Sequence, residues 1–170
     1  MSSPPSSSRS STPPDDAHDE RDLTILYATE TGTAQDVADR LARLCRCLHI
    51  RARVVNMDVY APVSFVITNG VQNVESSQSE LINESLVIFV VATTGTGREP
   101  RAMTPLWQML LRADLPEDLF EDLTFAVFGL GDTSYAKFCW PAKLLSRRLV
   151  HLGAMELCAR GEGDEQHHLG

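Results

Sequence analysis

The sequence has no long apolar segment. No run of about 18 or more consecutive apolar residues occurs, so no helix long enough to span a membrane is predicted. The N-terminus also lacks the apolar centre of a signal peptide, and the acidic residues between positions 15 and 20 argue against an Arg-rich transit peptide. We therefore expect a protein of the cytoplasm that does not associate with a membrane.

Basic residues and cysteines are also few. The 15 Lys and Arg residues are outnumbered by 23 Asp and Glu residues, for a formal charge of -8, and such a surface repels nucleic acid. Four cysteines without a C-x-x-C pair are too few for a disulfide framework, so we expect free thiols in a reducing compartment. His167 and His168 have no cysteine at ligand spacing, and no metal site is predicted.

The length suits one domain with a tail, because domains usually contain about 100 to 200 residues and the chain has 170. Residues 1–22 are rich in Ser, Pro and acidic side chains, which bury too little apolar surface to offset the entropy lost on ordering. We predict a disordered tail over residues 1–22 and one globular domain over residues 23–170.

Short apolar runs alternate with amphipathic segments along that domain. Strands are predicted at 23–28, 53–57, 86–91, 124–128 and 155–158, and helices at 34–48, 103–112 and 143–152. Strands that alternate with helices form a parallel sheet with helices on both faces, joined by right-handed crossovers. This doubly wound α/β architecture binds ligands beyond the carboxyl ends of its strands.

Two segments depart from the pattern. Residues 64–80 are rich in Asn, Gln and Ser where a compact α/β unit has a short helix, and we interpret them as a mobile insertion. The sequence stops at Gly170, directly after the loop that follows the fifth predicted strand. The helix expected to cover that side of the sheet is missing, so we expect a domain truncated at its C-terminus.

A threonine-rich loop follows the first strand. A helix N-terminus presents free N–H groups and the positive end of the helix dipole, and hydroxyls add donors, so this loop can hold a phosphate without Lys or Arg. The patterns GxxxxGK and GxGxxG are both missing, which favours a phosphate monoester. An N-capping threonine with a tight glycine turn would explain the same residues without a ligand. The loop consists of Thr29, Glu30, Thr31, Gly32, Thr33 and Ala34.

Two more loops of small residues follow the third and fourth strands, ATTGTG at 92–97 and GLGDTSYAKFC at 129–139. Small residues let the backbone approach a flat ring closely, and Tyr135 offers an aromatic plane for stacking. Either loop alone could be an ordinary turn. Three such loops at one end of one sheet indicate a site for a phosphorylated planar heterocycle.

The three loop sequences together resemble a known family. TETGTA, ATTGTG and GLGDTSYAKFC, in this order and spacing, are similar to the FMN domain of the diflavin reductases, which include cytochrome reductase and the reductase module of nitric oxide synthase. Within this family, the chain looks most like the NADPH-dependent enzymes that act in cytosolic iron–sulfur protein assembly. The segments that carry this likeness are ATETGTAQDVADRL, LVIFVVATTGTG, FAVFGLGDTSYAKF and GEGDEQHHLG. The resemblance covers residues 23–170 apart from the insertion. It implies a flavodoxin-like five-stranded sheet with the strand order 2-1-3-4-5.

The resemblance also implies which residues contact FMN. The first loop would hold the phosphate, the second would line the ring, and the third would embrace it with Tyr135 stacked on the isoalloxazine. The acid after Gly-Asp in the last loop would complete the site; it is Glu165 here, where the family has Asp. Because the cofactor supplies the chemistry, no catalytic acid or base is predicted. The residues of the second and third loops are Ala92, Thr93, Thr94 and Gly95, and Leu130, Gly131, Asp132, Thr133, Ser134, Tyr135, Ala136, Lys137, Phe138 and Cys139.

The implied function is electron transfer. In a full-length enzyme, electrons would pass from NADPH through FAD to the FMN of this domain and then to an iron–sulfur protein of the anamorsin type; the FAD and NADPH module lies outside these 170 residues. Two alternatives stay open, a free-standing carrier of the flavodoxin type and a cofactor-free interaction module. A signalling receiver domain shares the topology, but it needs an Asp at the end of the third strand, where residues 91–93 read Val-Ala-Thr.

Overall fold

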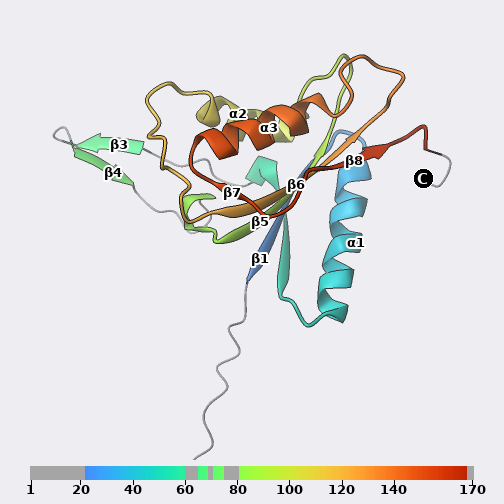
Figure 1. Cartoon of the computed structure of the whole chain (residues 1–170), viewed down its shortest axis with the longest axis horizontal. Helices are drawn as coiled ribbons and strands as arrows, with labels where there is room; N and C mark the ends of the chain where they lie inside the picture. Colours follow the sequence, from blue (N-terminus) through green and yellow to red (C-terminus); the bar gives the residue numbers. More distant parts are fainter. Residues whose placement is uncertain (1–21, 60–64, 69–70, 75–80, 168–170) are drawn as a thin grey trace, which may run out of the picture.

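The computed structural model describes residues 22–59, 65–68, 71–74 and 81–167 (Figure 1). The order of the parallel sheet is β2-β1-β5-β6-β7, with β8 also paired to β6, so two short strands share the fifth position. The predicted flavodoxin-like α/β fold with strand order 2-1-3-4-5 is confirmed. The strands are β1 Leu23–Ala28, β2 Ala52–Asn56, β5 Leu86–Ala92, β6 Thr124–Gly131, β7 Met155–Glu156 and β8 Gly161–Asp164.

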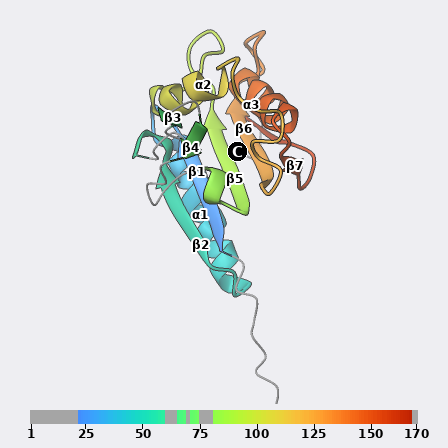
Figure 2. The same cartoon turned by 90° about the vertical axis from the view of Figure 1, so that its left-hand side faces the viewer.

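Helices pack on both faces of the sheet. The helix α1 Thr33–Cys47 covers one face, and α2 Thr104–Leu110 and α3 Trp140–His151 cover the other (Figure 1, Figure 2). None of the described helices is long and apolar enough to cross a membrane. Short 3-10 helices are η1 Met57–Val59, η2 Leu81–Asn83 and η3 Arg101–Met103.

The larger core lies between the sheet and the pair α2 and α3. Successive strand residues point to opposite faces, and on this face the fully buried rings of Phe89 and Phe125 meet edge to face with centroids 6.5 Å apart. Leu110 and Leu145 pack against them from the two helices. On the other face, buried alanines of α1 let this helix approach the sheet closely. Two cores therefore hold the central strands and fix the ends from which the loops leave.

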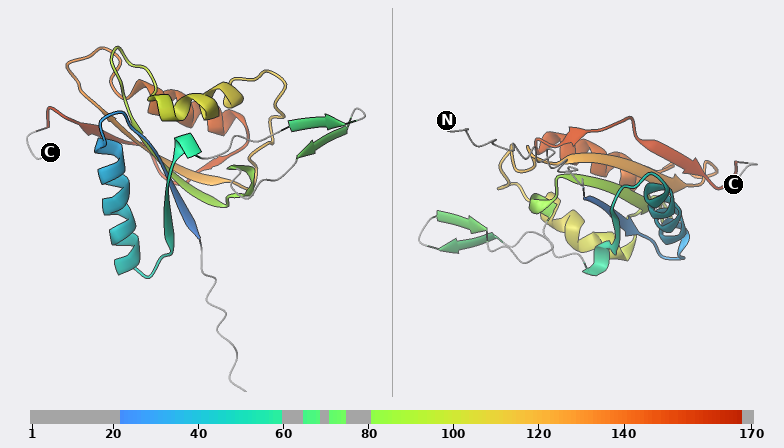
Figure 3. Two further views of the ribbon diagram at one scale, coloured as in Figure 1. Left: turned by 180° about the vertical axis from the view of Figure 1, so that it is seen from behind. Right: turned by 90° about the horizontal axis from the view of Figure 1, so that it is seen from below.

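A hairpin lies outside the main sheet. The strands β3 Phe65–Thr68 and β4 Val71–Val74 pair antiparallel with each other (Figure 3). These strands were not predicted, because the Asn, Gln and Ser content of residues 64–80 is typical of loops. The mobility of this segment stays a prediction. Residues 1–21 of the predicted tail and residues 60–64, 69–70, 75–80 and 168–170 lie outside the described part of the chain.

The fifth strand differs from its predicted form. Of the predicted 155–158, only Met155–Glu156 is strand, and β8 pairs further along β6, with Gly131 opposite Asp164. Glycine is required in β8, because a Cβ at Gly161 would lie 2.4 Å from the Phe128 ring. A Gly-rich polar segment carries no strand pattern, so only its contact with β6 makes it a strand.

Candidate functional site

The three loops named above lie together at the carboxyl end of the sheet. The loops after β5 and β6 rise side by side at the end where α1 begins (Figure 1, Figure 3). The backbone N–H of Thr93 donates to the carbonyl of Leu130 at 2.8 Å. The side-chain stem of Lys137 lies against Gly97, where an added Cβ would meet it at 2.3 Å. The second and third loops therefore support each other.

The first loop turns at Gly32, which precedes α1 with a φ of 100°. This turn is closed by Thr29, whose hydroxyl accepts a hydrogen bond from the Gly32 N–H at 2.9 Å. The hydroxyls of Thr31 and Thr33 lie 3.3 Å apart and are exposed, whereas Ala34, in the first turn of α1, is fully buried. Thr29 and Ala34 thus shape the turn, and Thr31 and Thr33 present two hydroxyls at the positive end of α1.

Glu30 of the same loop reaches toward another element. Its Oε1 accepts a hydrogen bond from the backbone N–H of Arg101 at 2.6 Å, at the start of η3. The structure therefore uses this carboxylate to connect the first loop to the chain that follows the second loop.

The second loop closes on itself. Thr94 and Arg98 exchange two backbone hydrogen bonds of 2.9 Å, and the Thr94 hydroxyl donates to the carbonyl of Arg98 at 3.0 Å. Gly95 and Gly97 have φ values of 47° and 92°, which favour glycine. The buried hydroxyl oxygen of Thr93, in contrast, has no hydrogen-bond partner among the described residues. An unpartnered buried hydroxyl costs free energy.

The third loop combines exposed and buried side chains. The ring of Tyr135 is 59% exposed, and Lys137 and Ala136 are exposed beside it. Cys139 is fully buried and takes a left-handed conformation at the start of α3. Burial, together with the charge of Glu162, raises the pKa of the Cys139 thiol to about 11. Tyr135 therefore offers a free aromatic face, whereas Cys139 anchors the loop.

Phe138 also belongs to the anchored part of the loop. The ammonium of Lys143 lies 5.2 Å from the centroid of the Phe138 ring, within the range of a cation–π contact. Phe138 and Cys139 thus direct the chain into α3, and the residues before them form the open rim of the site.

The last loop contributes a carboxylate that the sequence analysis did not name. Asp164 accepts hydrogen bonds from the N–H of Thr133 at 3.1 Å and from its hydroxyl at 2.7 Å. Glu165, the residue implied by the resemblance, is exposed, and its backbone N–H donates to the carbonyl of Gly131 at 2.9 Å. The sequence signal for Asp164 was its place at the end of a Gly-rich segment directly before Glu165.

The arrangement has the parts that FMN needs. Two exposed hydroxyls at a helix N-terminus suit a phosphate monoester. Small residues and an exposed tyrosine suit a flat heterocycle. Within the residues that the structure describes, no group of three metal-ligating side chains occurs.

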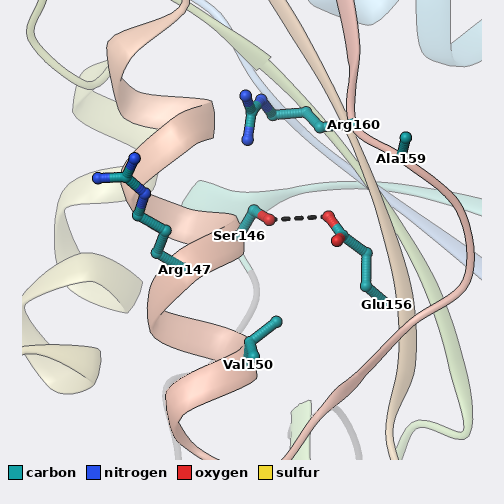
Figure 4. Close-up of a pocket in the computed structure, with 6 residues that line it drawn as sticks. All are labelled: Ser146, Arg147, Val150, Glu156, Ala159 and Arg160. Atoms are coloured by element: carbon teal, nitrogen blue, oxygen red, sulfur yellow. Dashed lines mark hydrogen bonds between the residues drawn. The ribbon is translucent and has the colours of Figure 1, made fainter.

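A separate open cavity of about 510 Å³ lies between α3 and the segment after β7 (Figure 4). The buried hydroxyl of Ser146 donates to Glu156 Oε1 at 2.8 Å across it, and Arg147 and Arg160 stand at its rim. None of its lining residues belongs to the three loops. The loop site is therefore the better candidate.

Comparison with known proteins shows the family and the fold of this chain. The family model described as Flavodoxin matches residues 25–169. NADPH-dependent diflavin oxidoreductase 1 of Mycosarcoma maydis is 45% identical over 154 residues, which are 91% of this chain and 21% of that protein. The same enzyme of Bos taurus is 44% identical over 148 residues, 87% of this chain and 22% of that protein. The chain thus spans about a fifth of the length of these curated relatives.

Solved structures show the same fold. A cysteine-to-alanine mutant of flavodoxin from Pseudomonas aeruginosa has a TM-score of 0.65 at 24% identity, with 87% of each chain covered. A flavodoxin of Streptococcus pneumoniae has a TM-score of 0.63 at 24% identity, with 84% of each chain covered.

Proposed function

Because the chain belongs to the flavodoxin family, we propose that it binds FMN between its three loops and carries electrons on the flavin. The observation that supports this most directly is the meeting of the second and third loops at the carboxyl end of the sheet, where the N–H of Thr93 donates to the carbonyl of Leu130 at 2.8 Å. The bound flavin supplies the redox chemistry, and the protein supplies orientation, stacking and nearby charge.

Each loop has its own task in this proposal. Thr31 and Thr33 bind the phosphate with their exposed hydroxyls and with the N–H groups of the α1 N-terminus. Residues 92–95 of the second loop would line the ring, and Tyr135 would stack on it from the third loop.

The relatives suggest a wider setting. They are named NADPH-dependent diflavin oxidoreductases, and the chain corresponds to about a fifth of their length. We propose that this domain works in the cytosol with an FAD and NADPH module of the same enzyme. That module reduces the flavin, and an iron–sulfur protein of the anamorsin type accepts the electrons. The resemblance of the loop sequences supports this route.

The first test compares FMN with riboflavin, which lacks the phosphate. We expect FMN to stay on the purified chain after desalting, as visible flavin absorption. The double change Thr31→Ala, Thr33→Ala should raise the FMN dissociation constant about tenfold or more, because hydrogen bonds to a charged group are strong. The dissociation constant of riboflavin should not change, and the control Thr31→Ser, Thr33→Ser should keep FMN binding. A folded wild-type chain that stays colourless would favour the interaction module.

The second test concerns the electron donor. The FMN-loaded chain should not be reduced by NADPH alone, and it should be reduced once a separately purified FAD and NADPH module of a diflavin reductase is added. Rapid loss of the flavin absorption with NADPH alone, followed by stopped-flow, would contradict the proposal that a separate module reduces the flavin.

A further inference from the structure

Asp164 connects two parts of the chain that are distant in the sequence, the third loop and the end of β8. Its carboxylate accepts three hydrogen bonds: Oδ1 takes the N–H of Thr133 at 3.1 Å and the N–H of Gln166 at 3.1 Å, and Oδ2 takes the hydroxyl of Thr133 at 2.7 Å. Thr133 is 31 residues away in the sequence. One side chain thus fixes the third loop to the end of β8.

The strand that carries Asp164 is itself firmly placed. β8 pairs with β6 over four residues, from Phe128 opposite Gly161 to Gly131 opposite Asp164. A Cβ at Gly163 would lie 2.9 Å from the Leu130 side chain, so β8 lies close beside β6. Asp164 is therefore held by the sheet, and the loop is held by Asp164.

A second carboxylate completes the link. Asp132 Oδ1 accepts the N–H of Ser134 at 2.7 Å, and Asp132 Oδ2 accepts the side-chain amide of Gln166 at 3.2 Å. These hydrogen bonds lower the pKa of Asp132, and those from Thr133 lower the pKa of Asp164. Both groups are ionised near neutral pH, so the bonds across the two segments are charge-assisted.

The linked residues lead directly to the aromatic ring of the site. Thr133 and Ser134 precede Tyr135, and the N–H of Tyr135 donates to the carbonyl of Asp132 at 3.1 Å. The ring of Tyr135 is 59% exposed. Its position over a bound ring consequently depends on the backbone of residues 132–134.

We propose that Asp164 is a positioning residue of the flavin site, which acts through Thr133 to hold Tyr135 in its stacking position. This inference rests on the proposed binding of FMN. It differs from what the resemblance implies, because there the acidic residue of this loop that completes the flavin site is Glu165. The contacts of Asp164 with Thr133 assign it to the loop.

The test compares three variants of the 170-residue chain. Asp164→Ala removes all three acceptors, Asp164→Asn keeps an oxygen for the two backbone N–H groups, and Glu121→Ala removes one exposed charge before β6 at the opposite end of the sheet. We expect Asp164→Ala to raise the FMN dissociation constant about tenfold. Asp164→Asn should recover most of this loss, and Glu121→Ala should bind like the wild type.

A spectroscopic signal separates positioning from general loss of stability. A stacked tyrosine quenches flavin fluorescence, so at saturating FMN the fluorescence of bound flavin should rise in Asp164→Ala and stay low in Asp164→Asn and Glu121→Ala. Equal dissociation constants and equal fluorescence in Asp164→Ala and the wild type would overturn the proposal.

Hydrogen exchange tests the role of Asp164 separately from the proposed binding of FMN. In the FMN-free chain, the Thr133 and Ser134 amides should exchange about tenfold faster in Asp164→Ala than in Glu121→Ala. If the wild type binds no FMN, the proposed function fails, and this exchange difference still decides whether Asp164 holds the loop. Equal exchange rates in Asp164→Ala and Glu121→Ala would show that Asp164 does not hold the third loop in place.

Discussion

The carboxylate of Glu30 accepts a hydrogen bond from the backbone N–H of Arg101, 71 residues later, at 2.6 Å. This contact joins the turn before α1 to the start of η3, and both elements flank the candidate flavin site. A single exposed side chain thus sets the distance between two segments that leave different strands of the sheet.

Replacing Glu30 should loosen this connection. Glu30→Ala is expected to lower the free energy of unfolding by about 1 kcal/mol, because the bond to the Arg101 N–H is lost at an exposed position. Glu30→Gln keeps an acceptor oxygen and should lose less. The control Gln35→Ala changes an exposed residue of α1. Urea unfolding measures all three, and a loss in Gln35→Ala as large as in Glu30→Ala would contradict the assigned role.

The two glycines of the second loop should respond differently to alanine. Both have positive φ, which costs an alanine about 1 kcal/mol, but only at Gly97 would the new Cβ meet Lys137, at 2.3 Å. Gly97→Ala should therefore destabilise the chain by about 1 to 3 kcal/mol more than Gly95→Ala, where nothing lies within 4 Å. Thermal unfolding of the FMN-free chain tests this, and equal losses would show that the third loop moves aside freely.

The four thiols should fall into two classes of reactivity. Cys47 and Cys158 are exposed, and Cys45 and Cys139 are buried. Burial raises the pKa of both buried thiols, that of Cys139 to about 11, so little thiolate forms there near pH 8. Labelling with a disulfide reagent at pH 8 should give two fast reactions. In denaturant, all four thiols should react at similar rates. Fast labelling of Cys139 in the folded chain would contradict its role as an anchor.

The sequence predicted the elements whose pattern is local. The apolar runs of β1, β5 and β6 predict strands, and the spacing of apolar residues in α1 predicts a helix. The motifs predict three loops at one edge of the sheet. β8 could not be predicted in this way, since Gly161 and Gly163 have low strand propensity and adopt the strand only because β6 lies beside them. α3 begins at Trp140, three positions before the predicted start, because Pro141 in its first turn hides the apolar pattern.

The candidate site was predictable as a set of loops and not as a set of contacts. Thr94 and Thr93 are neighbours of the same type, yet one hydroxyl is used within its own loop and the other is buried without a partner among the described residues. The bond from Thr133 to Asp164 likewise joins distant residues. Such contacts depend on how the strands bring the loops together, which composition and spacing do not encode.

Acid should weaken the link between the third and last loops. The pKa of Asp164 is lowered by the hydroxyl and N–H of Thr133, and that of Asp132 by the N–H of Ser134. Groups with a lowered folded pKa stabilise the fold above their unfolded pKa of about 4, and this stability is lost as pH falls through the folded pKa. The nearby His167 supports the charge of Asp164.

We therefore expect Asp164→Asn to be less stable than the wild type at pH 7, with the difference shrinking as the pH falls below about 4. Thr133→Ala removes the hydroxyl donor and brings the folded pKa of Asp164 closer to its unfolded value, so the acid loss should be smaller and complete at a higher pH than in the wild type. Urea midpoints between about pH 7 and pH 2.5 measure both effects. A difference between Asp164→Asn and the wild type that stays constant or grows in acid would show that the charge of Asp164 does not stabilise the folded loops.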